Sequence, residues 1–223
     1  EVLNFYGIPY VVLRSSDFGG VDLSGFTKVV IASDQDQTFY NAMDAYRWWF
    51  EDYVSNGGVL EIHAAAWGWH GGGWIGPLPG GLGWASYYAN YVTIVDYAHP
   101  VVTTPNPISD AELDGWNSSV HGYLHTYPAG SHIVIIEDST GQPAYLEFDY
   151  GAGFIVASSQ TLEWAYRWGY SQILANSLLY IPVKYDHDLA VSLEAPTSLK
   201  LDTSALLNAT VRNRGLNDET NVE

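Results

Sequence analysis

The sequence predicts an α/β domain with a mostly parallel sheet and helices on both faces, followed by the first strands of an all-β module. Two nearly continuous apolar runs, residues 28–33 and 59–62, are typical of strands buried on both faces of a parallel sheet. Between them, residues 39–54 repeat apolar side chains with helical spacing. From Leu189 the pattern changes to the alternation of half-buried strands. We therefore expect an α/β domain over residues 1–181, a linker over 182–188 and an incomplete β-sandwich over 189–223.

The amino-terminal elements follow the order of a βαβ unit. Residues 1–6 are typical of the end of a helix, which Gly7 stops in a left-handed conformation. Residues 9–14 predict a strand and residues 28–33 a second one. The helix over 39–54 ends at a Gly-Gly pair, and the strand over 59–62 follows directly. Strand, helix, strand in this order indicates a parallel sheet.

The second half of the domain begins with a long loop over residues 64–90, rich in tryptophan and glycine. Beyond it we expect a short helix near residues 110–116 and strands at 91–95, 132–137, 144–149 and 154–158. Gly151 and Gly153 predict a hairpin between the last two strands, placed at the edge of the sheet. A closing helix over 172–181, capped by Ser171, completes the domain.

Composition excludes several functions. Eight basic residues face 25 acidic ones, and the net charge of −17 repels phosphate backbones, so nucleic acid is excluded as a partner. No apolar run approaches the roughly 18 residues of a membrane-spanning helix. The absence of cysteine excludes disulfides, thiolate metal sites and a cysteine nucleophile in this chain. An acidic, lysine-poor chain rich in tryptophan and tyrosine is typical of the outside of a microbial cell, so we expect an extracellular or cell-surface location.

Three motifs in order carry a family resemblance. The segment Gly-Gly-Val-Leu-Glu-Ile-His-Ala-Ala at 57–65, the pair His99-Pro100, and Tyr-Gly-Ala-Gly-Phe-Ile at 150–155 resemble elements of the class I glutamine amidotransferase-like superfamily. The nearest match is its trehalose-utilization (ThuA-like) family. The resemblance covers residues 1–181 and implies a flavodoxin-like sheet. The amidotransferase nucleophile would stand at His63, so glutaminase and other cysteine hydrolase activity is excluded. The segment 161–165 departs from the Gly-His of the ThuA-like pattern.

The resemblance also bears on both ends of the chain. A flavodoxin-like sheet has a central first strand, and none precedes Glu1, so we expect upstream or downstream parts of a parent protein, or another chain, to complete the sheet. That strand would lie between residues 9–14 and 28–33. The segment 187–215 resembles the start of an adhesion-related (CARDB-type), immunoglobulin-like β-sandwich. We therefore expect a fragment of a large multidomain protein.

Candidate site residues follow the ends of the predicted strands, where α/β sheets bind ligands. His63 is either a metal ligand or general base, or a histidine that is hydrogen-bonded to the backbone and holds its turn. Asp34 and Asp36 bind a hard cation, pair as general acid and base, or cap the helix that follows. Glu163 either has a raised pKa through burial or pairs with Arg167 four residues later. His63, Asp34 and Glu163 form the candidate catalytic set and the candidate site for a divalent cation, zinc or calcium, with His121 or His125 arriving from a loop.

The tryptophan-rich loop has two interpretations. In the first, the flat faces of the tryptophans stack on sugar rings. In the second, the tryptophans cover the α/β domain or pack on a neighbouring module. The candidate ligand-binding residues are Trp67, Trp69, Trp74, Trp84 and His121. The sugar-stacking interpretation predicts that Trp67, Trp69 and Trp74 line a groove beside His63.

Two functions remain open at this point. The first is a non-catalytic interaction or carbohydrate-binding module of a large extracellular or cell-surface protein, favoured by the missing nucleophile and the tryptophan loop. The alternative is a metal-assisted carbohydrate-active enzyme that uses His63 with Asp34 or Glu163. A stoichiometric metal at His63 would favour the second function.

Overall fold

The structure is a computed structural model that describes residues 1–170, 172–184, 189–194, 198, 204 and 208–213. It divides into two compact units, Glu1–Ile181 and Pro182–Glu223. Among the described residues, no helix has both the length and the apolar character needed to cross a membrane.

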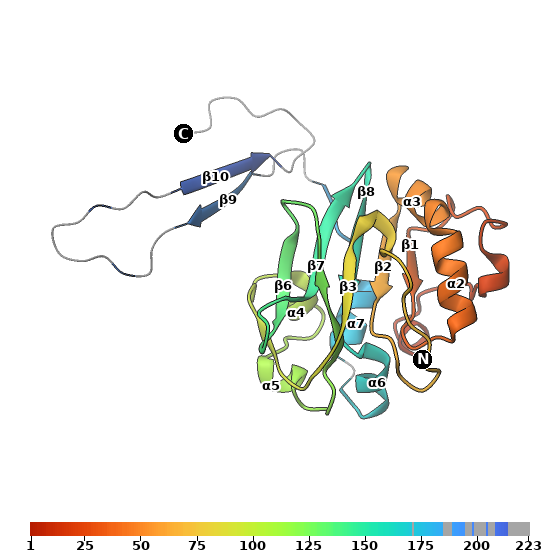
Figure 1. Cartoon of the computed structure of the whole chain (residues 1–223), viewed down its shortest axis with the longest axis horizontal. Helices are drawn as coiled ribbons and strands as arrows, with labels where there is room; N and C mark the ends of the chain where they lie inside the picture. The colour runs from red at the N-terminus through yellow and green to blue at the C-terminus, as the bar shows by residue number, and fades with distance from the viewer. Residues whose placement is uncertain (171, 185–188, 195–197, 199–203, 205–207, 214–223) are drawn as a thin grey trace. The chain divides into compact units, whose positions relative to one another are not determined.

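A six-stranded mixed sheet forms the centre of the first unit, in the order β1-β2-β8-β7-β6-β4 (Figure 1). β1, β2 and β8 run parallel, and β7, β6 and β4 are added antiparallel, so four of the six strands point the same way. The strands are β1 (Lys28–Ile31), β2 (Val59–His63), β4 (Val92–Ile94), β6 (His132–Glu137), β7 (Pro143–Tyr150) and β8 (Gly153–Ser158). The expected α/β class is confirmed.

Alternation along β2 divides the core between the two faces of the sheet. Leu60 and Ile62 pack into one hydrophobic cluster with residues of the helices α2 (Gln37–Ala45) and α3 (Arg47–Ser55). Val59 packs into a second cluster with residues of α7 (Gln172–Leu179). Glu61 and His63 share the face of Val59, because side chains two residues apart point to the same side. The sheet therefore has helices on both faces.

One cross-strand row on the α7 face carries two buried carboxylates. Glu61 of β2 is in register with Val156 of β8, and Val156 is in register with Glu147 of β7. Both glutamates are almost fully buried. Such charges need partners within the protein, since an unpaired buried carboxylate is costly.

The helix expected over residues 39–54 is two helices. α2 ends at Tyr46, whose φ of −109° and ψ of 17° depart from helical geometry, and α3 begins at the next residue. The remaining helices are short: η1 (Ser15–Asp17) packs against α2 and η2 (Pro79–Gly81) against α3. The others are α1 (Val2–Phe5), α4 (Pro100–Thr103), α5 (Asp110–Leu113) and α6 (Leu162–Arg167).

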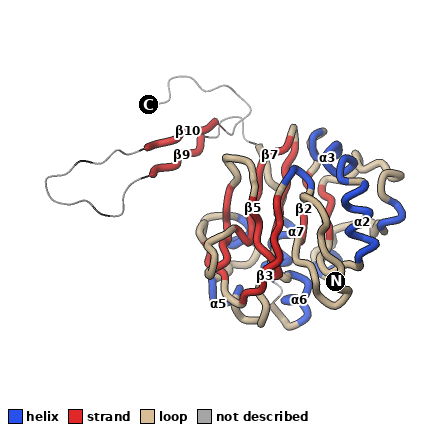
Figure 2. The backbone as a smooth tube through the Cα atoms, viewed as in Figure 1, coloured by secondary structure: helices blue, strands red, loops and turns tan. Residues whose placement is uncertain are grey.

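A two-stranded antiparallel sheet replaces the end of the expected loop over 64–90. β3 (Gly83–Ala89) pairs with β5 (Val120–His125), with a bulge between Ala85 and Tyr88 (Figure 2). Leu82 and Leu124 join the α3-side core, so this small sheet packs against the domain. The loop prediction was wrong for this segment.

Two further expectations about strands are corrected. Residues 9–14 have no regular secondary structure and pair with no strand that the structure describes, and Val11 and Val12 keep 63% and 74% of their surface exposed. The outer edge of β1 is likewise unpaired by any described strand. Direct pairing of 9–14 with β1, one of the two forecast arrangements, is absent from the described residues, and the other, a strand from another chain inserted between them, stays a prediction. The hairpin at Gly151 and Gly153 does form, but β7 and β8 lie in the middle of the sheet rather than at its edge.

Among the residues of the second unit that the structure describes, β9 (Leu189–Glu194) pairs antiparallel with β10 (Asn208–Asn213). Residues 182–184 precede it without regular structure. The expected cap Ser171, the linker residues 185–188 and much of the CARDB-like segment lie outside the described residues.

Candidate functional site

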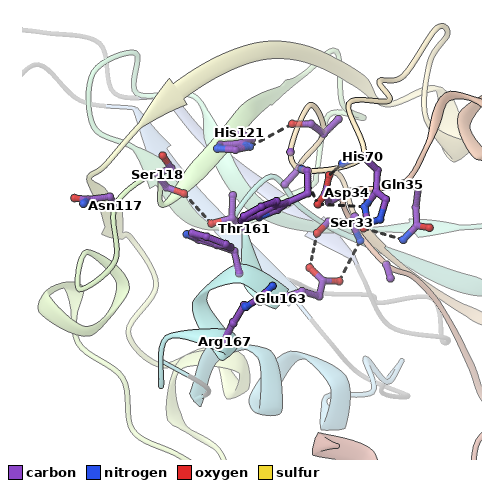
Figure 3. Close-up of a pocket in the computed structure, with 16 residues that line it drawn as sticks. Ser33, Asp34, Gln35, His70, Asn117, Ser118, His121, Thr161, Glu163 and Arg167 are labelled. Atoms are coloured by element: carbon purple, nitrogen blue, oxygen red, sulfur yellow. Dashed lines mark hydrogen bonds and ion pairs between the residues drawn. The ribbon is translucent and has the colours of Figure 1, made fainter.

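A cavity of about 670 Å³ lies beyond the carboxyl ends of the parallel strands. Ser33 and Asp34 follow β1, Ala65 and Ala66 follow β2, and Thr161 follows β8. This is the edge at which open α/β sheets bind ligands. The wall is completed by Ala32, Gln35, Gly68, Trp69, His70, Asn117, Ser118, His121, Glu163, Trp164 and Arg167 (Figure 3).

His63 stands behind this cavity, with only 1% of its surface exposed, and both of its ring nitrogens are bonded. Nδ1 lies 2.6 Å from Oε1 of Glu163, and Nε2 lies 2.7 Å from Oε1 of Glu61. A ring that donates from both nitrogens to two carboxylates is an imidazolium. His63 is therefore held as a cation between two anions.

Glu163 joins this buried pair to the cavity wall. Its Oε2 accepts a hydrogen bond from the Ser33 hydroxyl at 2.5 Å, and its Oε1 accepts one from the Ser33 amide at 3.1 Å. The Glu163 side chain keeps 36% of its surface exposed. Both carboxylate oxygens are thus held by residues at the ends of β1 and β2, while the exposed part of the side chain faces the cavity.

A second set of contacts holds Glu61 on the far side of His63. Lys28 forms an ion pair with Glu61 and donates to the backbone oxygens of Ser177 and Tyr180 at 2.6 and 2.8 Å. The Ser177 hydroxyl donates to Glu61 Oε1 at 2.6 Å, and Tyr145 is hydrogen bonded to Ser177 at 3.0 Å. The charges alternate along Lys28, Glu61, His63 and Glu163, so each has an opposite neighbour.

The pKa values follow from this alternation. Burial by itself would lower the pKa of His63, but Glu163 and Glu61 raise it to about 10. Burial would raise the pKa of Glu163, but the charge of His63 and the bonds from Ser33 lower it to about 2. The pKa of Glu61 is likewise lowered against burial by Lys28 and His63. Of the two interpretations of Glu163, the one with a net rise of its pKa through burial was wrong, because His63 and Ser33 outweigh the effect of burial.

These bonds decide between the two interpretations of His63. A metal ligand or general base needs a nitrogen lone pair, and neither ring nitrogen offers one here. The geometry favours a structural role for His63, but its partners are two carboxylates rather than the backbone groups that this interpretation named. The predicted pairing of Glu163 with Arg167 is absent, since the Arg167 guanidinium lies 5.9 Å over the ring of Trp69 instead.

Asp34 stands apart from His63 and Glu163. Its carboxylate accepts the amides of Trp69 at 2.9 Å and His70 at 3.1 Å, and its backbone adopts a φ of +53°. Asp34 therefore ties the tryptophan loop to the end of β1. The three residues expected to share a cation do not form one ligand group among the described residues. Asp36 caps α2 by accepting the Phe39 amide at 2.9 Å, as one interpretation predicted.

The two loop histidines separate. His121 lines the cavity and contacts the Ala66 carbonyl at 3.3 Å, and burial lowers the pKa of its ring. His125 is not part of the cavity wall and is bonded to the Thr126 hydroxyl at 2.8 Å.

Of the four candidate tryptophans, only Trp69 lines the cavity, and it keeps 75% of its surface exposed. Trp74 donates to the Ala64 carbonyl at 2.9 Å and packs edge-on against Tyr40. Trp84 lies in β3 and packs against the α3-side core. Trp67 is half exposed but covers Gly73 rather than the cavity. The groove predicted for Trp67, Trp69 and Trp74 is thus supplied by Trp69 alone.

Sequence reasoning missed Trp164 and Arg167 as wall residues. Trp164 lies 5.8 Å from Trp69, ring centroid to ring centroid, with an interplanar angle of 46°. Their position in the sequence could have indicated this role. Because α6 begins four residues after β8 ends, the first turn of α6, which includes Glu163 and Trp164, must lie at the carboxyl edge of the sheet. Asn117 and Ser118 carried no such signal, because they lie in a turn between α5 and β5.

Comparisons with known proteins identify no family. No family model matches the sequence. An uncharacterized protein of Clostridium acetobutylicum is 28% identical over 155 residues, which cover 68% of this chain and 15% of that protein. This chain therefore spans about a seventh of the length of that relative.

Several solved structures are similar at low identity. The cytoplasmic protein STM3548 of Salmonella typhimurium has a TM-score of 0.47 and 14% identity, covering 81% of this chain and 84% of that chain. The exo-beta-1,4-mannosidase Op5Man5 of Opitutaceae bacterium strain TAV5 has a TM-score of 0.48 and 18% identity, over 80% of this chain and 29% of the enzyme. A beta-galactosidase of Bacillus circulans has a TM-score of 0.36 and 13% identity, over 77% of this chain and 26% of the enzyme.

Proposed function

We propose that residues 1–181 are a non-catalytic carbohydrate-binding module of a larger extracellular or cell-surface protein. The observation that carries this proposal is the pair of tryptophan rings at the cavity wall, Trp69 and Trp164, beside polar side chains at the carboxyl edge of the sheet. Aromatic faces provide a large apolar area with defined geometry, which suits the flat face of a pyranose.

The polar lining supports a neutral, hydroxyl-rich ligand. Asn117, Gln35 and Ser118 offer both donors and acceptors, and Arg167 adds a donor beside Trp69. Binding pockets for small molecules typically combine apolar walls with a few placed polar groups, and about 670 Å³ falls within their usual range. An oligosaccharide unit fits both the chemistry and the size.

The binding role is favoured over catalysis by the state of the charged groups. Retaining and inverting glycosidases need one carboxyl group with a raised pKa and a second carboxylate across the bond. Glu163 instead has its pKa lowered to about 2 and is bonded to His63 and Ser33. Asp34 is bonded to two loop amides. Both carboxylates are engaged in holding the wall.

Two finer parts of the proposal concern the whole protein. We assign residues 1–181 to a flavodoxin-like, ThuA-like fold and residues 189–223 to the start of an immunoglobulin-like, CARDB-type module. Support comes from the motif order in the first unit and from the antiparallel pair β9–β10 in the second. The small share of the Clostridium relative that this chain covers supports a larger parent protein.

The unpaired edge of β1 supports a partner strand. Backbone groups along an exposed edge are ready to pair with another strand, and residues 9–14 present an exposed apolar segment. We propose that a strand from outside residues 1–223 adds to β1, and that residues 9–14 then pack against it. Amide exchange tests this: the amides of Val29 and Val30 point to opposite edges of β1, and the one that faces away from β2 should exchange fast in the present chain and become protected in the full-length protein.

The binding function is tested with purified protein and a panel of neutral oligosaccharides of two to six glucose, mannose or galactose units. Binding is followed by tryptophan fluorescence and by amide chemical shifts around Ala65 and Thr161. We expect Trp69→Ala and Trp164→Ala each to weaken binding by about fivefold or more, taking the stacking of a sugar ring to be comparable with the roughly 1–3 kcal/mol of a base stacked on an aromatic side chain.

Trp48→Ala is the matched control, because Trp48 is an exposed tryptophan of α3 outside the cavity wall. It should leave binding unchanged. Absence of binding across the panel, or equal effects of Trp48→Ala and Trp69→Ala, contradicts the proposal. Hydrolysis of any oligosaccharide that is lost in Glu163→Gln would restore the enzymatic alternative.

A further inference from the structure

A second polar cluster lies away from the cavity, where α4 meets β6 and β7. His99 precedes α4, His132 opens β6, and Glu147 lies in the middle of β7. One ligand atom from each lies within 4.8 Å of the others. None of the three lines the cavity described above.

The spacing of the three side chains suits a small cation. Glu147 Oε1 lies 3.5 Å from His99 Nε2 and 3.7 Å from His132 Nδ1, and the two rings meet edge-on with centroids 5.0 Å apart. Ligands about 2.0–2.2 Å from a tetrahedral zinc ion are roughly 3.3–3.6 Å from one another. The observed separations need only small side-chain movements to reach that geometry.

One nitrogen of the cluster is buried without a hydrogen-bond partner. His99 keeps 3% of its surface exposed, and its Nε2 makes no hydrogen bond. The nearest carboxylate oxygen, Glu147 Oε1, is 3.5 Å away, which is long for a bond to a carboxylate. A buried, unpartnered polar atom needs an explanation, and an ion placed between these groups supplies one.

His132 is already oriented as a metal ligand. Its Nε2 lies 2.7 Å from Oδ2 of Asp96, which leaves Nδ1 directed toward Glu147. Metal-ligating histidines usually donate their second ring nitrogen to a carboxylate in this way, which fixes the tautomer. The His132 side chain is 26% exposed, so an ion can enter from this side.

We propose that His99 Nε2, His132 Nδ1 and Glu147 bind one divalent transition-metal ion of the zinc class, with Asp96 as the outer partner of His132. Two nitrogens and one oxygen form a ligand set that zinc accepts, and they leave a fourth position for water. Calcium and magnesium prefer all-oxygen sites and are excluded by the two imidazoles. The charges of Glu147 and Asp96 balance the ion.

Metal binding requires one local change. His99 Nδ1 now accepts the Val101 amide at 3.2 Å, whereas a neutral imidazole bound through Nε2 carries its proton on Nδ1. Losing this hydrogen bond leaves two donors, the Val101 amide and the Nδ1–H of His99, facing each other without an acceptor, so the ring must turn slightly away from α4. That loss is small beside the affinity of a three-ligand zinc site, so the change does not prevent binding.

The site would connect segments far apart in the sequence. His99 and Glu147 are separated by 48 positions, and α4 packs against α7 through the same region, where Tyr180 lies edge-on to His99 with centroids 4.9 Å apart. A bound ion therefore fixes the start of α4 to the sheet, independently of any ligand in the cavity.

The experiment uses the present chain, stripped with chelator and then dialysed against Zn²⁺, Co²⁺ or Ca²⁺. We expect one Zn²⁺ per chain, a tetrahedral Co²⁺ visible spectrum and no Ca²⁺. Nitrogen-15 spectra of the imidazoles should show coordination of His99 through Nε2 and of His132 through Nδ1. His132→Gln and Glu147→Gln should each weaken Zn²⁺ binding by at least tenfold, and Asp96→Asn by about 10–100-fold.

His125→Gln is the matched control, because His125 lies outside the cluster and should leave Zn²⁺ binding unchanged. Asp96 is partly exposed, so Asp96→Asn tests the site even where a buried variant fails to fold. The proposal is overturned by no Zn²⁺ uptake, by uptake equal in Asp96→Asn and His125→Gln, or by coordination at other histidines. In that case the cluster is an imidazolium held between Glu147 and Asp96.

Discussion

His63 and Glu163 are one hundred positions apart, and their side chains meet at 2.6 Å between Nδ1 and Oε1. The contact joins the end of β2 to the first turn of α6. Because Ser33 binds the same carboxylate, the ends of β1 and β2 are fixed to α6 through one residue. The wall of the cavity is thereby built by a buried cation and a half-exposed anion.

Glu163→Gln should lower the free energy of unfolding by about 1–3 kcal/mol, because it removes a charged partner from buried His63. Urea unfolding measures the change. The exposed control Asp52→Asn should change stability by less than about 0.5 kcal/mol. A double-mutant cycle with His63→Gln should give a coupling energy above about 0.5 kcal/mol. Additive effects of the two substitutions would contradict direct pairing.

Stability should have its maximum between about pH 5 and 6.5. The pKa of Glu163 is about 2 when folded, so as the pH falls below about 5 the unfolded chain binds a proton that the folded chain does not, and stability is lost. The pKa of His63 is about 10 when folded, against an ordinary value of 6.5. Its stabilisation is complete below pH 6.5 and is lost as the pH rises toward 10.

Urea unfolding between pH 3 and 10 measures both limbs. His63→Gln should flatten the alkaline limb, while Glu163→Gln should reduce both, since the two groups stabilise each other. An alkaline limb that is unchanged in His63→Gln would show that another group titrates there.

Gly153→Ala should destabilise the first unit by at least about 1–3 kcal/mol. An added Cβ at the start of β8 would overlap the backbone oxygens of Gly58 and Val54, and backbone cannot move aside as a flexible side chain can. Gly25→Ala is the control, because no atom lies within 4 Å of its added Cβ. Thermal unfolding compares the two; equal melting temperatures would mean that the hairpin does not approach α3 so closely.

Replacing Val11 and Val12 by serine should reduce self-association and dye binding with little loss of stability. Both side chains are mostly exposed, so little apolar burial is lost, whereas contiguous exposed apolar surface promotes association. Light scattering against concentration and a hydrophobic fluorescent dye give the readouts. If the double substitution leaves self-association unchanged, the surface that mediates it lies elsewhere.

The parts of the fold that the sequence predicted are those whose signals are local. The Gly57-Gly58 break before β2 and the apolar runs of β6 and β8 needed no knowledge of their neighbours. Residues 9–14 have the composition of a strand, but a strand also requires a partner edge, and composition does not report whether one is present.

The main feature that the sequence did not predict was the pairing of strands far apart in the chain. β3 and β5 are separated by thirty residues, and β5 contains a glycine and two histidines, so neither segment shows a clear alternation. In the site, the contact of His63 with Glu163 was within reach, because both follow parallel strands. The rotation of Asp34 toward Trp69 was not, since it depends on a positive φ that no local pattern indicated.

Glu61 shares a cross-strand row with Val156 and Glu147 and is buried together with Lys28, and this burial implies an order of assembly. Lys28, Glu61 and His63 are synthesised more than a hundred residues before Ser177 and Tyr180 of the closing segment. Until that segment docks, the ammonium of Lys28 and the carboxylate of Glu61 keep water as their partner, because burying them earlier would leave bonds unmade. The face of the sheet that α7 covers is therefore buried last, because its charged groups need the residues near 180 as hydrogen-bond partners.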